Sequence, residues 1–287
     1  PGWHIECSAM AMEYLGESFD LHCGGEDLMF PHHENEIAQS ETATHKTFAR
    51  HWMHVRFLLV DGRKMSKSEG NFYTLRDLLL KGYKASAIRL ALISVPYRKQ
   101  FNFTFEGVAD AAKAIERLRT FAGRLKGNFA AGESAEMQEA AKKALEEFRA
   151  ALADDLNTAE ALAPVFELVR ATNGAIDQGQ FFAADREAVL AALKDFDAVF
   201  DVLEDRDAEP TRRALEWAEG AGRMGDVVPE LVAAQSLTDE AIETLVAERA
   251  AAKKARNFAR ADEIRAELAE KGVVIEDSKD GVRWKRR

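Results

Sequence analysis

The sequence predicts an α/β domain followed by an all-α region, with a small mixed α/β domain at the C-terminal end. Short apolar runs alternate with glycine turns and a helical pattern in the first 80 or so residues, amphipathic helical patterns fill the middle, and two β-rich runs come last. Strand, turn, helix and strand in succession are typical of an α/β domain. Consecutive amphipathic helices joined by short polar loops are typical of a helical bundle.

In the first region, the apolar runs at 19–22 and 55–60 are expected to be strands, because turn-forming residues follow each of them. Between these runs, Pro31 is expected at the first position of a helix that extends to about Gln39, since proline is favoured there. Residues 1–80 therefore have the succession of elements that an α/β domain requires.

From about Thr74 onward the pattern is helical. Thr104 is expected to cap a helix to Arg124, whose apolar residues recur at steps of three and four. Three further helices are expected at 133–152, 159–176 and 184–203. Core packing is the simplest explanation of their apolar stripes.

The last region is expected to begin with a helix that Thr238 caps, followed by a helix over 259–271 that ends at Gly272. Two short strands are expected at 273–275 and 282–284, around a turn. The expected domain boundaries are then 1–80, 81–220, a linker at 221–236, and 237–287.

Composition and charge narrow the class of protein. The chain has 287 residues, a formal net charge of −10 and only two cysteines, so a reducing cytoplasm is the simplest location and a uniformly basic nucleic-acid-coating surface is excluded. No apolar run of about 18 residues is present, so no membrane contact is expected. From Arg249 to Arg287, 12 Lys/Arg stand against 7 Asp/Glu. A basic end on an acidic body suggests contact with a polyanion there.

One candidate metal site is visible in the spacing of residues. His32 and Glu36 lie four residues apart, so both project from one face if the segment is helical. Cys7 is a third candidate ligand, close to them if the first strand lies beside the helix start. Thiolate, imidazole and carboxylate together suit zinc. Spacing alone is weak evidence, because His/Glu pairs at this distance are common on solvated helices.

Two further segments could bind phosphate or nucleoside. The run Lys64 to Ser68 places two lysines near hydroxyl groups, ahead of Gly70 and Asn71, and could clamp phosphates. By composition alone, an ordinary solvated turn is the simpler explanation. Gly25 permits close approach of the backbone, and the carboxylate of Asp27 could bind a ribose hydroxyl.

The run Lys64 to Ser68 reads KMSKS, the signature of class I aminoacyl-tRNA synthetases, without a substitution. Further blocks closely resemble those of cysteinyl-tRNA synthetases, and they occur in the family's order at 2–10, 24–36, 154–158, 261–265 and 276–284. The resemblance covers the whole chain. It implies the C-terminal half of a class I Rossmann-type catalytic domain, then a helical bundle, then a small anticodon-recognition domain.

The resemblance also implies roles for individual residues. Three would be zinc ligands in a site that binds the thiolate of substrate cysteine: Cys7, His32 and Glu36. Trp3 would pack beside the amino acid, with a plain core position as the alternative. Lys64 and Lys67 would neutralise phosphate charge during attack of the cysteine carboxylate on ATP, which Mg²⁺ accompanies. Gly25, Asp27 and Lys67 would border ATP.

The C-terminal end would contact tRNA(Cys) through four residues: Lys253, Asp262, Asp277 and Trp284. Lysine at 253 departs from the arginine expected there, and lysine cannot form the same bidentate contact. Cys23 replaces an expected small residue and is interpreted as a buried thiol without function. A monomer is expected.

No His-x-Gly-His motif is present, although class I synthetases carry one near their N-terminus. The chain is therefore interpreted as the C-terminal portion of a cysteinyl-tRNA synthetase that lacks this half and is inactive alone. A non-catalytic tRNA-binding fragment or paralogue is one alternative. The cysteine ligase of mycothiol synthesis is another, but it should lack a matching anticodon-binding end.

Overall fold

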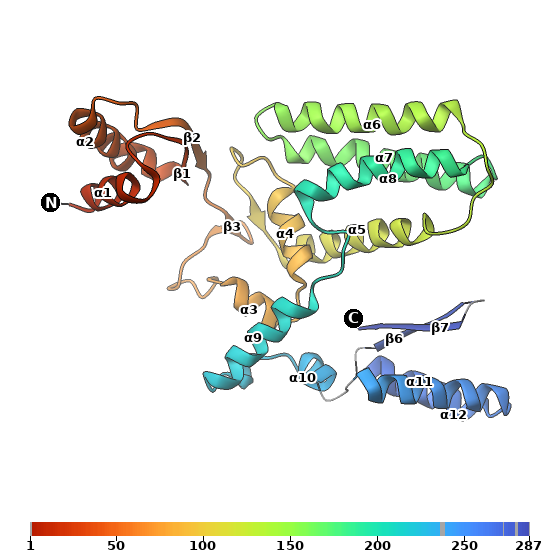
Figure 1. The fold of residues 1–287 in the computed structure, drawn as a ribbon. Coiled ribbons are helices and arrows are strands. Elements are labelled where there is room, and N and C mark those ends of the chain that lie inside the picture. The colour runs from red at the N-terminus through yellow and green to blue at the C-terminus, as the bar shows by residue number, and fades with distance from the viewer. Residues whose placement is uncertain (1, 236–238, 272, 279–280, 287) are drawn as a thin grey trace. The chain divides into compact units, whose positions relative to one another are not determined.

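The computed structural model describes residues 2–235, 239–271, 273–278 and 281–286 (Figure 1). Within these residues the protein is mostly helical and has three small sheets. The chain divides into two units, Pro1–Phe72 with Ser86–Glu204 and Tyr73–Ala85 with Asp205–Arg287. The four-part division expected from the sequence stays a prediction.

The first unit begins with two helices beside a parallel pair of strands. The elements are α1 (Trp3–Leu15), β1 (Phe19–Gly25), the short helical turns η1 (Glu26–Leu28) and η2 (Met29–His33), α2 (Glu34–Thr44) and β2 (Ala49–Val55). Helix α1 packs against α2, and β1 pairs with β2. Because parallel strands need a crossover connection, α2 is the element that allows this pairing. In the register, His22 lies opposite Trp52 and Gly24 opposite His54.

Two expectations for this region were wrong, and helix α1, which contains Cys7, was not predicted. The expected strand at 55–60 is split: β2 ends at Val55 and β3 begins at Leu59, because the chain leaves the first sheet where Arg56 N donates to Tyr97 O at 3.1 Å. Cys23 is exposed and not buried, since alternate residues of a strand face opposite sides and His22 takes the inner side.

A second small sheet supports the KMSKS segment. Strand β3 (Leu59–Val60) pairs antiparallel with β4 (Arg63–Lys64) and parallel with β5 (Asn102–Phe103). The two residues between β3 and β4, Asp61 and Gly62, have φ angles of 49° and 74°. Positive φ at both positions is typical of the tight turns that join hairpin strands. This turn sets the register in which Lys64 pairs with Leu59, and so fixes the position of the Lys64 backbone.

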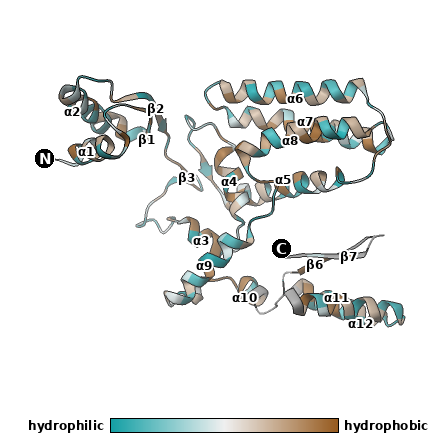
Figure 2. Cartoon of the chain, viewed as in Figure 1, coloured by the Kyte–Doolittle hydropathy of each residue, from teal (hydrophilic) through white to brown (hydrophobic). Residues whose placement is uncertain are grey.

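Helix α4 (Ala85–Ile93) comes before the helical bundle that the sequence predicts. The bundle is present, and its four helices are α5 (Phe105–Arg124), α6 (Ala135–Ala153), α7 (Thr158–Asp177) and α8 (Ala183–Phe200). Figure 1 shows α6, α7 and α8 running alongside one another, and Figure 2 shows hydrophobic and hydrophilic residues alternating along them. Phe196 and Phe200 stack with ring centroids 4.7 Å apart in the core. The side chain of Thr104 accepts a hydrogen bond from Gly107 N, so the expected cap of α5 is confirmed.

A buried carboxylate joins two helix starts of the bundle. Asp185 is fully buried and accepts hydrogen bonds from Ser134 N at 2.9 Å, Gln138 Nε2 at 3.0 Å and Phe182 N at 3.0 Å. The first backbone N–H groups of a helix have no partner within the helix. One side chain therefore satisfies donors at the starts of both α6 and α8.

The second unit contains one group of helices around α9 and another at the C-terminal end. Helix α3 (Leu75–Leu80) packs with α9 (Ala208–Gly220), which the sequence analysis did not predict. The expected linker holds a helical turn, η3 (Met224–Asp226), and helix α10 (Pro229–Gln235).

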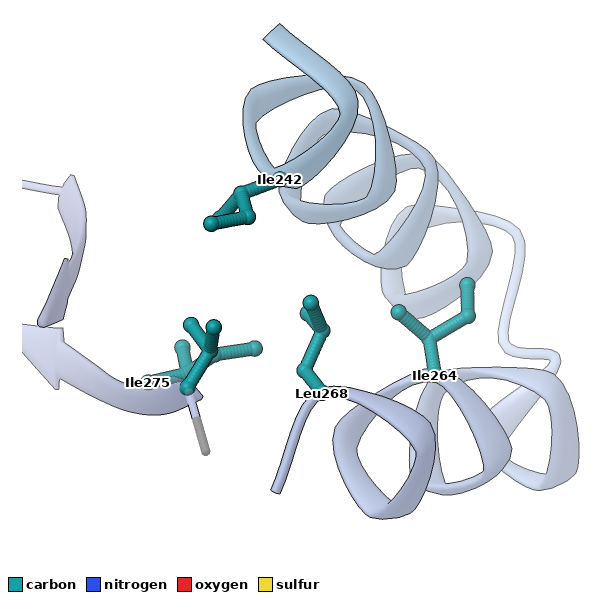
Figure 3. Close-up of a cluster of buried hydrophobic side chains, with 5 residues drawn as sticks. Ile242, Ile264, Leu268 and Ile275 are labelled. Atoms are coloured by element: carbon teal, nitrogen blue, oxygen red, sulfur yellow. The ribbon is translucent and has the colours of Figure 1, made fainter. Parts of the chain in front are cut away.

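The C-terminal end consists of α11 (Asp239–Lys254), α12 (Phe258–Glu270) and the antiparallel strands β6 (Val273–Ser278) and β7 (Gly281–Arg286). The expected two helices and two strands are thus confirmed. Ile242, Ile264, Leu268 and Ile275 converge between the helices and the hairpin (Figure 3), together with Val273. The predicted cap at Thr238 and helix end at Gly272 lie outside the described residues.

We expect Asp185→Ala to lower the free energy of unfolding by roughly 1–3 kcal/mol, because it leaves two partly buried backbone N–H groups without their partner. Urea unfolding followed by helical circular dichroism measures the loss. Asp177→Ala is the matched control, since this aspartate pairs with Arg124 at the surface and should have little effect. Equal small effects of both substitutions would contradict a capping role for Asp185.

Candidate functional site

Three potential metal ligands meet between α1 and α2. One ligand atom each from Cys7, His32 and Glu36 lies within 4.8 Å of the others. Cys7 comes from the second turn of α1, and His32 and Glu36 span the junction of η2 and α2. Packing of α1 on α2 therefore unites residues that are 25 or more positions apart.

Glu36 is the central group of this cluster. Its side chain is fully buried, and its Oε2 atom lies 2.7 Å from His22 Nε2. Its Oε1 atom has no hydrogen-bond partner among the residues that the structure describes, although His32 Nε2 lies 3.2 Å away. A buried carboxylate oxygen without a partner is costly. A cation beside Oε1 would remove that cost.

His32 is held from its other side. Its Nδ1 lies 2.7 Å from Nδ1 of His4, and its ring stacks on Trp3 with centroids 4.3 Å apart. One of two paired ring nitrogens must donate and the other accept. If His32 Nδ1 donates, its Nε2 carries a lone pair toward Glu36, which is the tautomer that a metal ligand needs.

The thiol of Cys7 is tuned by its surroundings. Burial raises its pKa above the ordinary value, and the negative charge of Glu36 raises it further. Without a cation the sulfur therefore keeps its proton at neutral pH. A bound divalent ion has the opposite influence, because a coordinating thiol loses its proton.

A second possible ligand set shares Glu36. His22, His33 and Glu36 also bring one ligand atom each within 4.8 Å of one another. Burial lowers the pKa of His33 to about 4, helped by His22, so His33 is neutral at pH 7. Nδ1 of His33 lies 2.8 Å from His54 Nε2. Its ring packs so closely on Gly24 that a Cβ there would lie 2.6 Å from Cε1.

The two sets differ in chemistry. The first contains a thiol and the second does not, whereas members of both sets have a histidine behind them: His4 behind His32, and His54 behind His33. Such outer partners are what metal ligands usually have. A thiol, an imidazole and a carboxylate fit zinc, and three protein ligands leave a fourth tetrahedral position. We therefore favour the set with Cys7.

The sequence analysis missed four histidines of this cluster: His4, His22, His33 and His54. One signal was available, because all seven histidines of the chain lie in its first 54 residues. Spacing along the chain could not show their convergence, since it depends on the parallel register of β1 and β2 and on the packing of α1 against α2.

The KMSKS loop presents two exposed lysines. The ammonium group of Lys64 lies 5.8 Å from the ring centre of Phe57, and that of Lys67 lies 5.3 Å from the ring centre of Phe72. Within the described residues, no carboxylate lies within 4 Å of either ammonium group. Two positive charges without acidic partners are suited to an anionic ligand.

Gly25 and Asp27 lie together at the end of β1. A Cβ on Gly25 would lie 2.5 Å from Asp27 Oδ1, so only glycine lets this carboxylate turn back against the strand end. Asp27 is exposed in the turn η1. The ends of parallel strands are the usual place for nucleotides in α/β folds.

The four candidate tRNA contacts are distributed over the C-terminal end. Lys253 and Asp262 are exposed on α11 and α12, and Asp277 lies in β6. Trp284 is partly buried against the cluster of Figure 3. The structure thus gives Trp284 a packing role, which leaves only part of its ring for a ligand.

Within the described residues, no helix is both long and apolar enough to cross a membrane. Family models match three successive segments of the chain. Residues 1–113 match the class I (C) tRNA synthetase catalytic domain, 147–204 match the DALR domain, and 236–284 match the cysteinyl-tRNA ligase anticodon-binding domain.

Similar proteins agree with these matches. The chain is 55 % identical over its whole length to a cysteine–tRNA ligase of Koribacter versatilis and 52 % identical to one of Solibacter usitatus. It spans 59 % and 56 % of those two proteins. Among solved structures, the LeuRS of Agrobacterium radiobacter K84, in a ternary complex with tRNA and LeuAMS, aligns with 68 % of this chain and 27 % of its own. Its TM-score of 0.50 at 16 % identity supports a shared fold. Three family models in succession and close relatives along the whole chain place this protein in the cysteine–tRNA ligase family.

Proposed function

We propose that this chain carries the amino-acid-selecting and tRNA-binding portion of an enzyme that activates cysteine with ATP and transfers it to tRNA(Cys). The observation that carries the proposal is the convergence of Cys7, His32 and Glu36 in a member of this family. A thiol-containing site with an open ligand position is well suited to select a substrate by its own thiol. In this proposal the enzyme is a cytoplasmic monomer.

Cys7, His32 and Glu36 would hold a zinc ion. When bound, the zinc would supply a soft Lewis acid that prefers sulfur, so that cysteine is selected over serine. A site that relies on shape alone discriminates a methylene-sized difference by only about 10–200-fold. The protein's contribution is to hold the three ligands rigidly: His22 fixes the carboxylate of Glu36, and His4 fixes the ring of His32.

Trp3 would bound the amino acid. It is 59 % exposed and stacks on His32, which argues against the alternative that it is a plain core residue. Its ring therefore has a free face next to the proposed ligand cluster. A flat apolar wall there would orient the substrate and limit access of water.

Phosphate chemistry would fall to the KMSKS loop. Attack of the cysteine carboxylate on the α-phosphate of ATP needs no side-chain nucleophile, so the work is positioning and neutralisation of charge. Lys64 and Lys67 would stabilise the charge that builds up on the phosphates as pyrophosphate leaves, with Mg²⁺ accompanying ATP. Gly25 would let the adenosine approach the backbone closely, and Asp27 would accept a hydrogen bond from the ribose.

The C-terminal end would recognise tRNA. Lys253 and Asp262 are exposed and accessible to a large ligand. We propose that Lys253 contacts phosphate, that Asp262 and Asp277 bind base edges, and that Trp284 stacks on an unpaired base with the part of its ring that the core leaves open. In this proposal the bundle of α5 to α8 lies along the tRNA stem.

The complete reaction would belong to a longer protein. The sequence contains no His-x-Gly-His motif, and its first matched relatives are considerably longer than the chain. We propose that residues 1–80 form the C-terminal half of the class I nucleotide-binding domain and that the chain alone does not charge tRNA. The second candidate, binding of tRNA without catalysis, is favoured by the same observation. The anticodon-binding match at 236–284 argues against mycothiol synthesis.

We expect the purified chain to contain about one zinc ion, and we expect Glu36→Ala and Cys7→Ser to lose it, because each removes one of only three ligands. Elemental analysis by mass spectrometry measures the metal. Cys23→Ser is a matched control, since this second cysteine is exposed on β1 and lies outside both ligand sets. Loss of zinc in the control, or its retention in Cys7→Ser, would refute the assignment.

In the longer protein, we expect Lys67→Ala to lower kcat for cysteine-dependent ATP–pyrophosphate exchange by roughly 10²–10³-fold, the usual effect of removing one charge-stabilising donor. The KM for cysteine should change little, because Lys67 does not contact the amino acid in this proposal. Lys46→Ala is the control, since Lys46 pairs with Glu17 outside the loop. Normal exchange by Lys67→Ala would exclude its role in catalysis.

A further inference from the structure

One residue of the KMSKS segment is buried although its surroundings are exposed. Asn71 is 8 % exposed, whereas its neighbours Gly70 and Phe72 and both loop lysines, Lys64 and Lys67, are exposed or only partly covered. A buried side-chain amide is stable only if its donors and acceptor have partners. The partners of Asn71 lie within the loop itself.

The amide of Asn71 makes two hydrogen bonds to the loop backbone. Its Oδ1 accepts from Ser66 N at 2.8 Å, and its Nδ2 donates to Lys64 O at 3.1 Å. The Asn71 side chain thus bonds both Lys64, the last residue of β4, and Ser66, which lie seven and five positions before it in the chain. The loop is closed by this amide rather than by a strand ladder.

The conformation of Gly70 makes this closure possible. Its φ angle is +69°, and its N–H donates to Lys67 O at 3.3 Å, so the chain turns sharply just before Asn71. A Cβ at Gly70 would meet nothing within 4 Å, and glycine is therefore needed here for backbone conformation and not for space. The turn directs Asn71 back into the loop.

Hydroxyl groups add a second layer of contacts within the same loop. Ser66 Oγ lies 2.7 Å from Ser68 Oγ, and Ser68 N donates to Ser66 Oγ at 3.3 Å. Ser66 is therefore held by Asn71 on its backbone and holds Ser68 through its side chain. The backbone on both sides of Lys67 is fixed through Asn71.

We infer that Asn71 is a positioning residue that sets the backbone of the KMSKS loop, so that the ammonium groups of Lys64 and Lys67 face one phosphate ligand together. The Asn71 side chain donates directly to the carbonyl oxygen of Lys64. It acts on Lys67 only indirectly, through its bond to the backbone N–H of the preceding residue, Ser66. Two charges help a transition state only if their positions are fixed beforehand. The catalytic consequence of this inference rests on the function proposed above, whereas the closure of the loop does not.

The test compares Asn71→Ala and Asn71→Asp with Asn102→Ala. Alanine removes both bonds. Aspartate keeps an acceptor for Ser66 N but places a carboxylate oxygen against Lys64 O. Asn102 is a matched control, since its Oδ1 accepts from Gly62 N at 2.7 Å in the adjoining hairpin turn, outside the loop.

Residue-resolved amide exchange on the 287-residue chain gives the first readout. In Asn71→Ala, the Ser66 amide should exchange roughly tenfold faster, the loss expected for one hydrogen bond. The Ser66 amide should stay protected in Asn102→Ala and be partly protected in Asn71→Asp. Unchanged protection of Ser66 in Asn71→Ala would overturn the inference, whatever the enzyme does.

Pyrophosphate exchange by the longer protein gives the second readout. Asn71→Ala should lower kcat at least tenfold and leave the KM for cysteine within about twofold, with Asn71→Asp between it and the unsubstituted protein. A parallel rise in the KM for cysteine would indicate general loss of structure and overturn the positioning role. If the unsubstituted protein catalysed no ATP–pyrophosphate exchange, the proposed function would be refuted. The rate of hydrogen exchange at the Ser66 amide would still decide whether Asn71 closes the loop.

Discussion

The fully buried carboxylate of Glu36 is the constraint on which the N-terminal part of the molecule depends. Taking a carboxylate out of water costs several kcal/mol unless nearby groups compensate. The groups around it come from separate elements: Cys7 from α1, His22 from β1 and His32 from the turn before α2. The relative positions of these elements are therefore tied to one side chain.

The same constraint explains why histidines surround the cluster. A histidine can donate to a carboxylate oxygen or keep a lone pair for a cation, according to which ring nitrogen carries the proton. His22 occupies one oxygen of Glu36, and the other oxygen remains without a hydrogen-bond partner in the described part of the chain. The Oε2 atom of Glu36 thus has a hydrogen-bond partner, and its Oε1 atom could bind a cation.

Single polar side chains that satisfy several backbone groups recur elsewhere in the protein. Asp185 accepts hydrogen bonds at the starts of two helices, and Asn71 joins two backbone groups of one loop. In both cases one side chain does what a longer run of regular structure would otherwise do. This allows the KMSKS segment to stay short, exposed and ordered.

How much the sequence predicts depends on the range of the interactions involved. Helices α5 to α8 were predicted because their apolar residues repeat with the helical period, which is a local property. Helix α1 was missed because this signal is absent: large apolar residues such as Trp3, Met10 and Tyr14 are exposed, and the buried residue of the helix is Ser8. The prediction of one strand at 55–60 was wrong because the two ends of this apolar run belong to different sheets.

The candidate site shows the same division. Cys7, His32 and Glu36 were proposed from residue type, spacing and family resemblance, and the structure brings them together. The supporting histidines depend on strand register and helix packing, which no local pattern encodes. The role of Asn71 requires the positive φ of Gly70, and a sequence shows only that glycine permits it.

The most direct test of the central claim is X-ray absorption at the zinc edge on the zinc-loaded chain, because it identifies the atoms bound to the ion. Coordination by Cys7, His32 and Glu36 predicts one sulfur at about 2.3 Å and nitrogen or oxygen at about 2.0–2.2 Å. A shell of nitrogen and oxygen alone would contradict the account and assign the ion to His22, His33 and Glu36 instead.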